Sequence, residues 1–114
     1  MIVVVTGGRD YFDGDTVWRV LYEVHAEYEI DLLVHGAAAG ADASAHEWAK
    51  ENNVRRYPCP ADWDRLGRRA GPIRNRYMLD TFRPDLVVAF PGGTGTADCV
   101  RAAEERGIKV LKVE

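Results

Sequence analysis

Short apolar, β-branched runs alternate along the chain with longer segments that carry an apolar stripe. The runs occupy five stretches, at 2–6, 31–35, 54–57, 85–90 and 108–113. Continuous apolar runs are typical of strands that are covered on both faces, as in a parallel sheet. Strands that alternate with helices predict parallel neighbours joined by right-handed crossovers. The alternation therefore predicts an α/β fold.

The segments between these runs have the spacing of helices. In the stretch 15–29, Val17, Val20, Leu21 and Val24 recur at the 3.6-residue period of an amphipathic helix. With 114 residues, the chain is long enough for one domain and too short for two. We therefore expect residues 1–114 to form a single domain.

Two of the expected helices follow a proline or a glycine-rich turn. Before the fourth strand, we expect a helix that points Ile73, Tyr77 and Met78 inward. After the fourth strand, Thr94 or Thr96 is expected to cap the last helix, because threonine hydroxyls accept hydrogen bonds from first-turn N–H groups.

Doubly wound sheets supply the strand order by analogy. We expect a five-stranded, mainly parallel sheet in the order 3-2-1-4-5, with Arg55 and Arg56 marking the third strand as an edge. In this order the winding reverses between the first and fourth strands. Ligands in such sheets bind beyond the carboxyl ends of the strands at that point, where the turns 7–13 and 91–96 meet.

Composition restricts the class of protein. The net charge of −3 argues against a dedicated nucleic-acid binder, which usually has a basic excess. Two cysteines are too few for a disulfide scaffold, and no apolar run approaches the roughly 18 residues of a membrane span. No leader-like segment opens the sequence. We expect a soluble cytoplasmic protein with no membrane partner.

The turn 91–96 reads Pro-Gly-Gly-Thr-Gly-Thr and directly precedes an expected helix. Glycines let a backbone approach a ligand closely, and a helix N-terminus attracts an anion. A tight turn with no ligand is the alternative, although three glycines exceed what turning requires. The turn lacks the Gly-Lys-Ser/Thr of a Walker-type phosphate loop and the spacing of a dinucleotide fingerprint.

Two further turns offer similar chemistry. Gly7 and Gly8 precede Arg9, which either binds phosphate or pairs with a neighbouring aspartate at the surface. The turn 36–42 either packs a helix closely on a strand or faces a ligand. In the same way, Asp42 either caps a helix or accepts a hydrogen bond from a ribose hydroxyl.

Arg74 and Asn75 begin the helix before the fourth strand. An arginine fork and an amide can bind phosphate and sugar or base, and a solvated helix face is the alternative. Among the three histidines, only His35 ends a strand near the expected pocket. The histidines lack metal-ligand spacing, so we expect no metal and no cofactor.

At this point four motifs resemble the SLOG superfamily, which includes the LONELY GUY phosphoribohydrolases and the Smf/DprA fold. The resemblance is strongest to its YspA/YpsA-like branch, which is frequent in phages and bacteria. The motifs cover most of the chain and read VVTGGRDYFD at 4–13, HGAAAGADASAHEWA at 35–49, GPIRNRYML at 71–79 and FPGGTGTADCV at 90–100. The resemblance implies a Rossmann-like three-layer fold, a nucleotide-derived ligand and a homodimer or higher homo-oligomer.

One departure from the LONELY GUY motif affects the expected activity. That motif reads PGG-x-GT-x-x-E, and its glutamate acts with an upstream arginine, which Arg74 matches. The glutamate position here is Cys99, and a thiol cannot replace a carboxylate in hydrolysis of a glycosidic bond. Asp98 lies one residue earlier, about 100° away around a helix. Arg74 and Asp98 are therefore the catalytic candidates only if the protein is an enzyme.

Three functions follow from this reasoning. The first is the binding or sensing of a small nucleotide-like molecule. The second is hydrolysis of a nucleotide N-glycosidic bond, with Asp98, Asp42 or Asp10 as the carboxylate. The third, which the acidic composition disfavours, is nucleic-acid binding of the DprA type through the arginines at 55, 56, 65, 68, 69, 74 and 76. The expected ligand-binding residues are Gly7, Gly8, Arg9, Asp10, His35, Gly36, Gly40, Asp42, Arg74, Asn75, Pro91, Gly92, Gly93, Thr94, Gly95 and Thr96.

Overall fold

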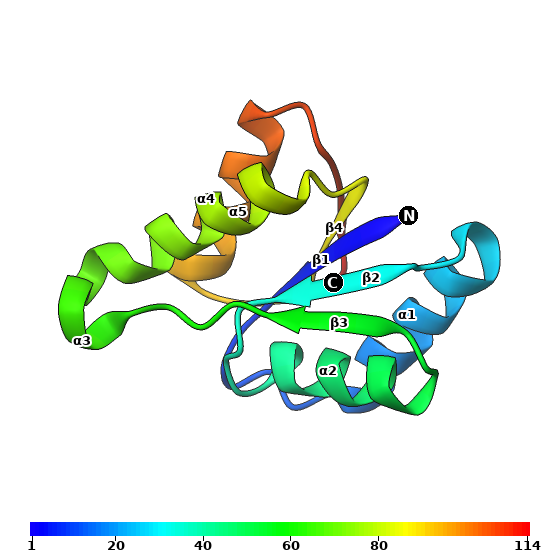
Figure 1. Ribbon diagram of the computed structural model, residues 1–114. Helices are drawn as coiled ribbons and strands as arrows, with labels where there is room; N and C mark the ends of the chain where they lie inside the picture. The colour runs from blue at the N-terminus through cyan, green and yellow to red at the C-terminus, as the bar shows by residue number, and fades with distance from the viewer.

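A computed structural model describes residues 1–114 and contains a single five-stranded sheet (Figure 1). The strands are β1 (Ile2–Thr6), β2 (Leu32–His35), β3 (Arg55–Pro58), β4 (Leu86–Ala89) and β5 (Lys109–Lys112). All neighbouring strands are parallel, in the order β3-β2-β1-β4-β5. The predicted strand order is therefore confirmed, and β3 lies at an edge as expected.

Helices cover both faces of the sheet. They are α1 (Gly14–Tyr28), α2 (Ala41–Glu51), α3 (Trp63–Leu66), the 3₁₀ turn η1 (Gly67–Arg69), α4 (Ala70–Phe82) and α5 (Thr94–Glu105). Helices α1 and α2 lie on one face and α4 and α5 on the other, which makes the three layers of a Rossmann-like fold (Figure 1). Helix α3 extends outward beyond the carboxyl ends of the strands (Figure 1). No helix has both the length and the apolar character needed to span a membrane.

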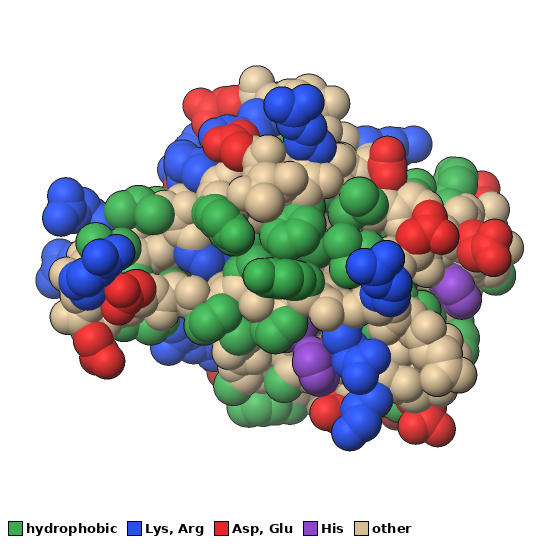
Figure 2. Space-filling model, in the orientation of Figure 1, with side chains coloured by type: hydrophobic (Ala, Val, Ile, Leu, Met, Phe, Trp, Pro, Cys, Tyr) green, Lys and Arg blue, Asp and Glu red, His purple; other side chains and the backbone are tan.

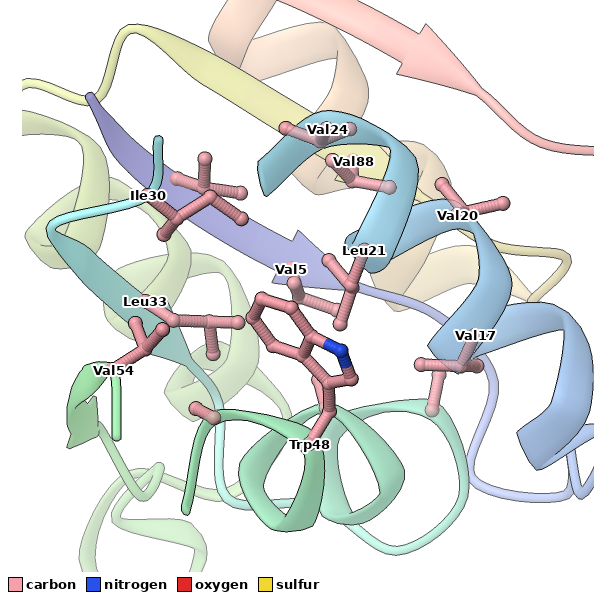
Figure 3. Packing of buried hydrophobic residues seen from close by; sticks show 14 of the residues in the cluster. Val5, Val17, Val20, Leu21, Val24, Ile30, Leu33, Trp48, Val54 and Val88 are labelled. Carbon is pink, nitrogen blue, oxygen red and sulfur yellow. The ribbon is translucent and has the colours of Figure 1, made fainter. Parts of the chain in front are cut away.

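Each helical layer has its own hydrophobic core against the sheet. The larger core lies under α1 and α2 and contains 16 buried residues, with the fully buried Trp48 at its centre. Figure 3 shows the indole of Trp48 among Val5, Leu21 and Leu33. The smaller core contains 8 residues and packs Val4 and Val87 against α4 and α5. The central strands β1 and β4 contribute to both cores, as their apolar runs predicted.

The predicted inner face of α4 is partly wrong. Met78 is buried, but Ile73 and Tyr77 are 48% and 50% exposed. The inner stripe instead contains Asn75 and Leu79 beside Met78. A polar residue, Asn75, therefore occupies a core-facing position. Because the expected stripe was drawn through apolar residues only, it lies about one residue away from the buried face of the helix.

Candidate functional site

The turns after β1 and β4 meet at the point where the sheet reverses its winding. Thr6 pairs with Ala89 at the carboxyl ends of these strands. Beyond them, the Gly8 N–H donates a hydrogen bond of 2.9 Å to the Pro91 carbonyl. The Ala41 N–H at the start of α2 donates one of 3.2 Å to the Gly8 carbonyl. Three turns that are far apart in the sequence thus form one continuous surface.

A cavity of about 800 Å³ opens over this surface, within the range of small-molecule sites. It is lined by Thr6, Gly7, Gly8, Arg9, Ala38, Asp42, Trp63, Arg68, Gly71, Pro72, Arg74, Gly93, Thr94, Gly95, Thr96, Ala97, Asp98 and Arg101. A smaller cavity of about 280 Å³ adjoins it and shares Arg9, Ala38, Trp63 and Arg74 with it. Only three of the 18 lining residues are hydrophobic and four are arginines, so the main cavity can bind a ligand that carries charge.

The N-terminus of α5 contributes backbone donors to the cavity. Gly93 is the N-cap, and no side chain caps the helix, so the prediction that Thr94 or Thr96 does so is wrong. A Cβ added at Gly93 would meet no protein atom within 4 Å, so the cap position is open at the cavity. First-turn N–H groups have no partner within their own helix and carry partial positive charge. Gly93 to Thr96 line the cavity, so these donors are available to an anion.

Asp42 lies at the start of α2 and is only 5% exposed. It does not cap the helix, because Gly40 holds the N-cap position. Instead its Oδ2 accepts hydrogen bonds from the N–H groups of Gly36, at 3.0 Å, and Ala38, at 3.3 Å. Its Oδ1 is buried and has no hydrogen-bond partner, and Asp42 is one of the residues that line the cavity. Burial raises the pKa of Asp42 to about 6, although the hydrogen bond from Ala38 and the charge of Arg74 act in the opposite direction.

Arg74 extends from α4 across the end of β2. Its Nη1 donates to the Gly36 carbonyl at 2.6 Å and to the Cys59 carbonyl at 3.2 Å. Its Nε donates to Asn75 Oδ1 at 3.0 Å. The guanidinium is thereby held in place at the boundary of the two cavities, with Nη2 free of any hydrogen bond to the protein.

Asn75 is 2% exposed and joins α4 to the start of α5. Its Nδ2 donates to the Gly95 carbonyl at 3.2 Å and to Asp98 Oδ2 at 3.1 Å. Asn75 does not line the cavity, so its contacts position Arg74 and Gly95 for whatever binds there. This explains why a polar residue lies on the inner face of α4.

Asp98 lines the cavity but its carboxylate is already neutralised. It accepts hydrogen bonds from Arg76 at 3.0 Å and from Arg101 at 3.0 Å, in addition to the one from Asn75. Burial opposes ionisation, but the hydrogen bonds from Arg76 and Asn75 outweigh it and hold the pKa of Asp98 below its usual value. A carboxylate with three donors is a poor proton acceptor, which disfavours Asp98 as the catalytic base.

Cys99 is fully buried behind the site. Burial raises the pKa of its thiol to about 11, so it remains protonated at neutral pH. The position that carries glutamate in the LONELY GUY motif therefore holds neither a carboxylate nor a thiolate. This position has a packing role in the present chain.

Uncompensated positive charge remains at the cavity. Neither Arg9 nor Arg68 forms an ion pair, so the alternative that Arg9 pairs with a neighbouring aspartate does not apply. Arg9 instead lies over the indole of Trp63, with Cζ 5.1 Å from the ring centroid. Arginine side chains also gather, with acidic ones between them, at the tip formed by α3 (Figure 2). The cavity therefore attracts anions.

Several predicted ligand residues do not line either cavity. Asp10 is exposed outside it, and His35 is buried with its Nε2 2.9 Å from His46 Nδ1 and its Nδ1 accepting from the Ala37 N–H. Burial lowers the pKa of His35 to about 4, so it is neutral at pH 7. Gly40, Pro91 and Gly92 support the turns from outside the main cavity, and Gly36 lines only the smaller one.

Trp63, Arg68 and Arg101 line the cavity but were not among the predicted residues. Trp63 and Arg68 belong to the segment between β3 and α4. This segment is distant in the sequence from the glycine turns, and the fold brings both to the same cavity. An aromatic residue beside three arginines in a proline- and glycine-bounded loop was the one available signal. Of the seven arginines considered for nucleic-acid binding, four form hydrogen bonds or ion pairs within the protein: Arg56, Arg65, Arg74 and Arg76. No three His, Cys, Asp or Glu side chains meet as a metal site requires.

Comparisons with known proteins agree with this architecture. Solved structures with the same fold include DNA processing protein A (DprA) from Streptococcus pneumoniae, with a TM-score of 0.79 and 21% identity over 98% of this chain and 50% of that one. The molybdenum cofactor binding protein from Rippkaea orientalis gives a TM-score of 0.72 and 18% identity over 97% of this chain and 74% of that one. The chain thus spans half the length of DprA, and at these identities the likeness concerns the fold alone.

Sequence comparison is more specific. The chain is 38% identical over 117 aligned residues to the Gene 61 protein of Mycobacterium phage D29, covering 96% of this chain and 93% of that protein. A family model described as "YspA, cpYpsA-related SLOG family" matches residues 1–66, which include the turns after β1 and β2 and the whole of α2. The match contains the first two of the four motifs, at 4–13 and 35–49. The resemblance to the family is therefore confirmed, and the chain belongs to the YspA, cpYpsA-related SLOG family.

Proposed function

We propose that the protein binds a small nucleotide-like anion, with a phosphate group on the N-terminus of α5. The main support is the combination of free first-turn donors at Gly93 to Thr96 with Arg9 and Arg68, which lack ion-pair partners. Helix N-termini and arginine forks are the usual protein groups for binding phosphate. The lining carries four arginines against two aspartates, and Asp98 is paired with Arg76 and Arg101, so positive charge is in excess at the cavity.

Asp42 gives the proposed ligand a second feature. A buried carboxylate oxygen without a partner is costly unless a donor reaches it. A hydroxyl group on the ligand, such as that of a ribose, supplies this donor to Oδ1. The free Nη2 of Arg74 lies at the same boundary and contributes a donor for a neighbouring oxygen. A phosphorylated sugar matches these groups better than phosphate alone.

Thermal unfolding in the presence of ligands tests this proposal. Nucleoside monophosphates, dinucleotides and ADP-ribose-like compounds are added over a concentration series, and binding at 100 times Kd stabilises the fold by about 2.7 kcal/mol. Arg68→Gln is expected to weaken the best ligand about 3- to 10-fold, because one phosphate-facing charge is lost. Arg65→Gln is the matched control, since Arg65 lies in the same segment but pairs with Asp62 away from the main cavity. The absence of any concentration-dependent shift across the panel would overturn the proposal.

A second candidate function is hydrolysis of the N-glycosidic bond of a nucleoside monophosphate. The observation that favours it is the unpartnered oxygen of Asp42, whose pKa near 6 suits proton transfer at neutral pH. In this reaction water replaces the base at the anomeric carbon. The C–N bond breaks with its electron pair on the base nitrogen, Asp42 accepts a proton from the water, and the base takes up a proton from solvent, to which Asp42 later returns its own. Chromatography for free base after incubation with nucleoside monophosphates tests it. Release that persists in Asp42→Asn would exclude Asp42, and no release at high protein concentration would exclude the activity.

Association of the chain with itself, which the resemblance implies, stays a prediction. Analytical ultracentrifugation of the purified protein tests it directly. A sedimentation coefficient that matches 12.7 kDa at all concentrations would contradict it.

A further inference from the structure

Trp63 is the only aromatic side chain that lines the main cavity, and it also lines the smaller one. It begins α3, in the segment that extends beyond the carboxyl ends of the strands (Figure 1). Its residue is 44% exposed, whereas Trp48 is fully buried. A half-exposed indole at a cavity wall offers a flat apolar surface that the protein itself does not cover.

The surrounding residues hold this indole in place. Asp62 caps α3 by accepting a hydrogen bond from the Arg65 N–H, which anchors the backbone next to Trp63. On α4, a Cβ added at Gly71 would approach Cη2 of the indole to 3.0 Å. Glycine is about 1 kcal/mol less favourable than alanine inside a helix, so Gly71 has a packing reason. Glycine at this position lets the indole of Trp63 pack directly against the backbone of α4.

Arg9, in the turn after β1, covers part of the indole ring of Trp63. Its Cζ lies 5.1 Å from the indole centroid, and it forms no ion pair with the protein. A cation–π contact at an exposed site contributes only about 0.5–1 kcal/mol. Arg9 is therefore weakly held over the indole, and a flat ligand group together with an anion competes well for both residues.

Nucleobases are the flat groups that accompany the phosphate and sugar of the proposed ligand. We propose that Trp63 is a stacking platform for the base, and that Arg9 moves from the indole toward the phosphate or onto the outer face of the base when the ligand binds. This inference rests on the proposed function and adds a ligand class to it, since it requires an aromatic base and excludes a plain sugar phosphate as the preferred ligand.

The platform divides the site into two parts with different chemistry. The glycine turn of α5 and Arg68 hold the phosphate, and Asp42 faces the sugar. Trp63 lines the remaining part of the site, where the two cavities adjoin, and the base occupies that part. Stacking tolerates different bases because every base has a flat face, and larger purines gain more than pyrimidines.

Isothermal titration calorimetry with paired probes tests this inference. The probes are ribose 5-phosphate, which has the phosphate and sugar without a base, and the four monophosphates AMP, GMP, CMP and UMP. The best of the four is expected to bind about 5- to 150-fold more tightly than ribose 5-phosphate, which is the range for one stacked base. Trp63→Ala should reduce this ratio to within about twofold of one, and Trp63→Phe should keep most of it.

The affinity for ribose 5-phosphate separates stacking from a structural role. It should change by less than about twofold in Trp63→Ala, because the phosphate and sugar groups lie elsewhere. Tyr28→Ala is the matched control, an equally exposed aromatic residue on α1 and away from the cavity, and it should change neither affinity. Thermal unfolding of each variant confirms that it is folded.

Three other results of these titrations would contradict the stacking role of Trp63, alone or together with the proposed function. Equal binding of ribose 5-phosphate and all four nucleotides to the wild-type protein would overturn the stacking platform and leave the proposed function intact. An equal loss of both kinds of probe in Trp63→Ala would show that Trp63 only supports the fold of the site. No binding of any probe to the wild-type protein would overturn the platform together with phosphate binding at α5.

Discussion

Gly40 and Gly95 both lie at the start of a helix in the same site, but the space around them differs. A Cβ at Gly40 would collide with the carbonyls of Gly8 and Arg9, and its φ of 74° lies in the region that favours glycine. A Cβ at Gly95 would meet no atom within 4 Å, and the same holds for Gly93. Gly40 lets the start of α2 pack against the turn after β1, whereas Gly95 leaves open space at the start of α5.

The difference extends to the whole turns. Gly36 sits directly beneath the Arg74 guanidinium, and Gly7 and Gly8 lie against atoms of neighbouring turns. In contrast, the end of the turn after β4 is bordered by the cavity. Glycine in the turns after β1 and β2 is thus explained by folding, while Gly93 and Gly95 have no such explanation. Open space at the cavity thus distinguishes Gly93 and Gly95 from the glycines that are packed against protein atoms.

Gly40→Ala should have the largest effect on stability. Its backbone, at φ 74° and ψ −124°, costs a residue with a side chain about 1–3 kcal/mol, and the collision with the Gly8 and Arg9 carbonyls adds about as much. We expect the free energy of unfolding in urea to fall by about 3–5 kcal/mol. Gly67→Ala is the control, since Gly67 has a similar backbone, at φ 58° and ψ −136°, with open space around it. Equal losses in the two variants would show that the turns are not interlocked.

Asp42→Asn tests the buried carboxylate oxygen, Oδ1, that has no hydrogen-bond partner. The folded pKa of about 6 exceeds the usual 3.8, so Asp42 binds its proton more tightly in the folded state. The wild-type protein should therefore lose stability as the pH rises from about 4 to about 6, by at most about 3 kcal/mol. Asparagine cannot ionise and still offers an oxygen to Gly36 and Ala38.

Urea unfolding of both proteins at pH 4 and pH 7 measures this difference. The Asn variant should gain stability relative to wild type between the two pH values, and other carboxylates cancel because both proteins share them. A stability difference that does not change with pH would mean that Asp42 is not buried without a partner in solution.

Gly95→Ala should have the smallest effect on folding and a clear effect on binding. Gly95 is the second residue of α5, where alanine favours the helix by about 0.5–1 kcal/mol and contacts nothing. The added methyl group projects into the space that we assign to the phosphate, so the best nucleotide ligand should bind at least about tenfold more weakly. Urea unfolding and calorimetry measure the two effects. A variant that is more stable and binds equally well would place the phosphate elsewhere.

Much of the fold was predictable because apolar runs and turn residues act locally. The five strands followed from their apolar runs, their order from analogy with doubly wound sheets, and the edge position of β3 from the charges of Arg55 and Arg56. Helix faces were less predictable where a polar residue has an internal role. Asn75 faces the inside because it bonds to Gly95 and Asp98, and this displaced the expected stripe of α4.

Site residues were predictable where they belong to one contiguous sequence motif. They were less predictable where residues distant in the sequence come together. Gly93, Thr94, Gly95, Thr96, Arg74 and Asp42 meet at the cavity as expected. His35 and Asp10 do not, because a residue at a strand end or in a turn can point into the core or out to solvent. Only the partner atoms, such as the ring of His46 for His35, decide the direction.

The order of residues along the chain was enough to specify the layered sheet and the glycine turns, since backbone conformation and burial depend on short-range patterns. It was not enough to specify that Asp98 is neutralised, that Asp42 keeps one oxygen free, or that Trp63 stands beside Arg9. These properties depend on which charges and rings come within a few ångströms after folding. Arg76 and Asp98 are 22 positions apart in the chain, and Arg9 and Trp63 are 54 apart. Coulomb and stacking energies act over distance in space, so the packed structure sets them.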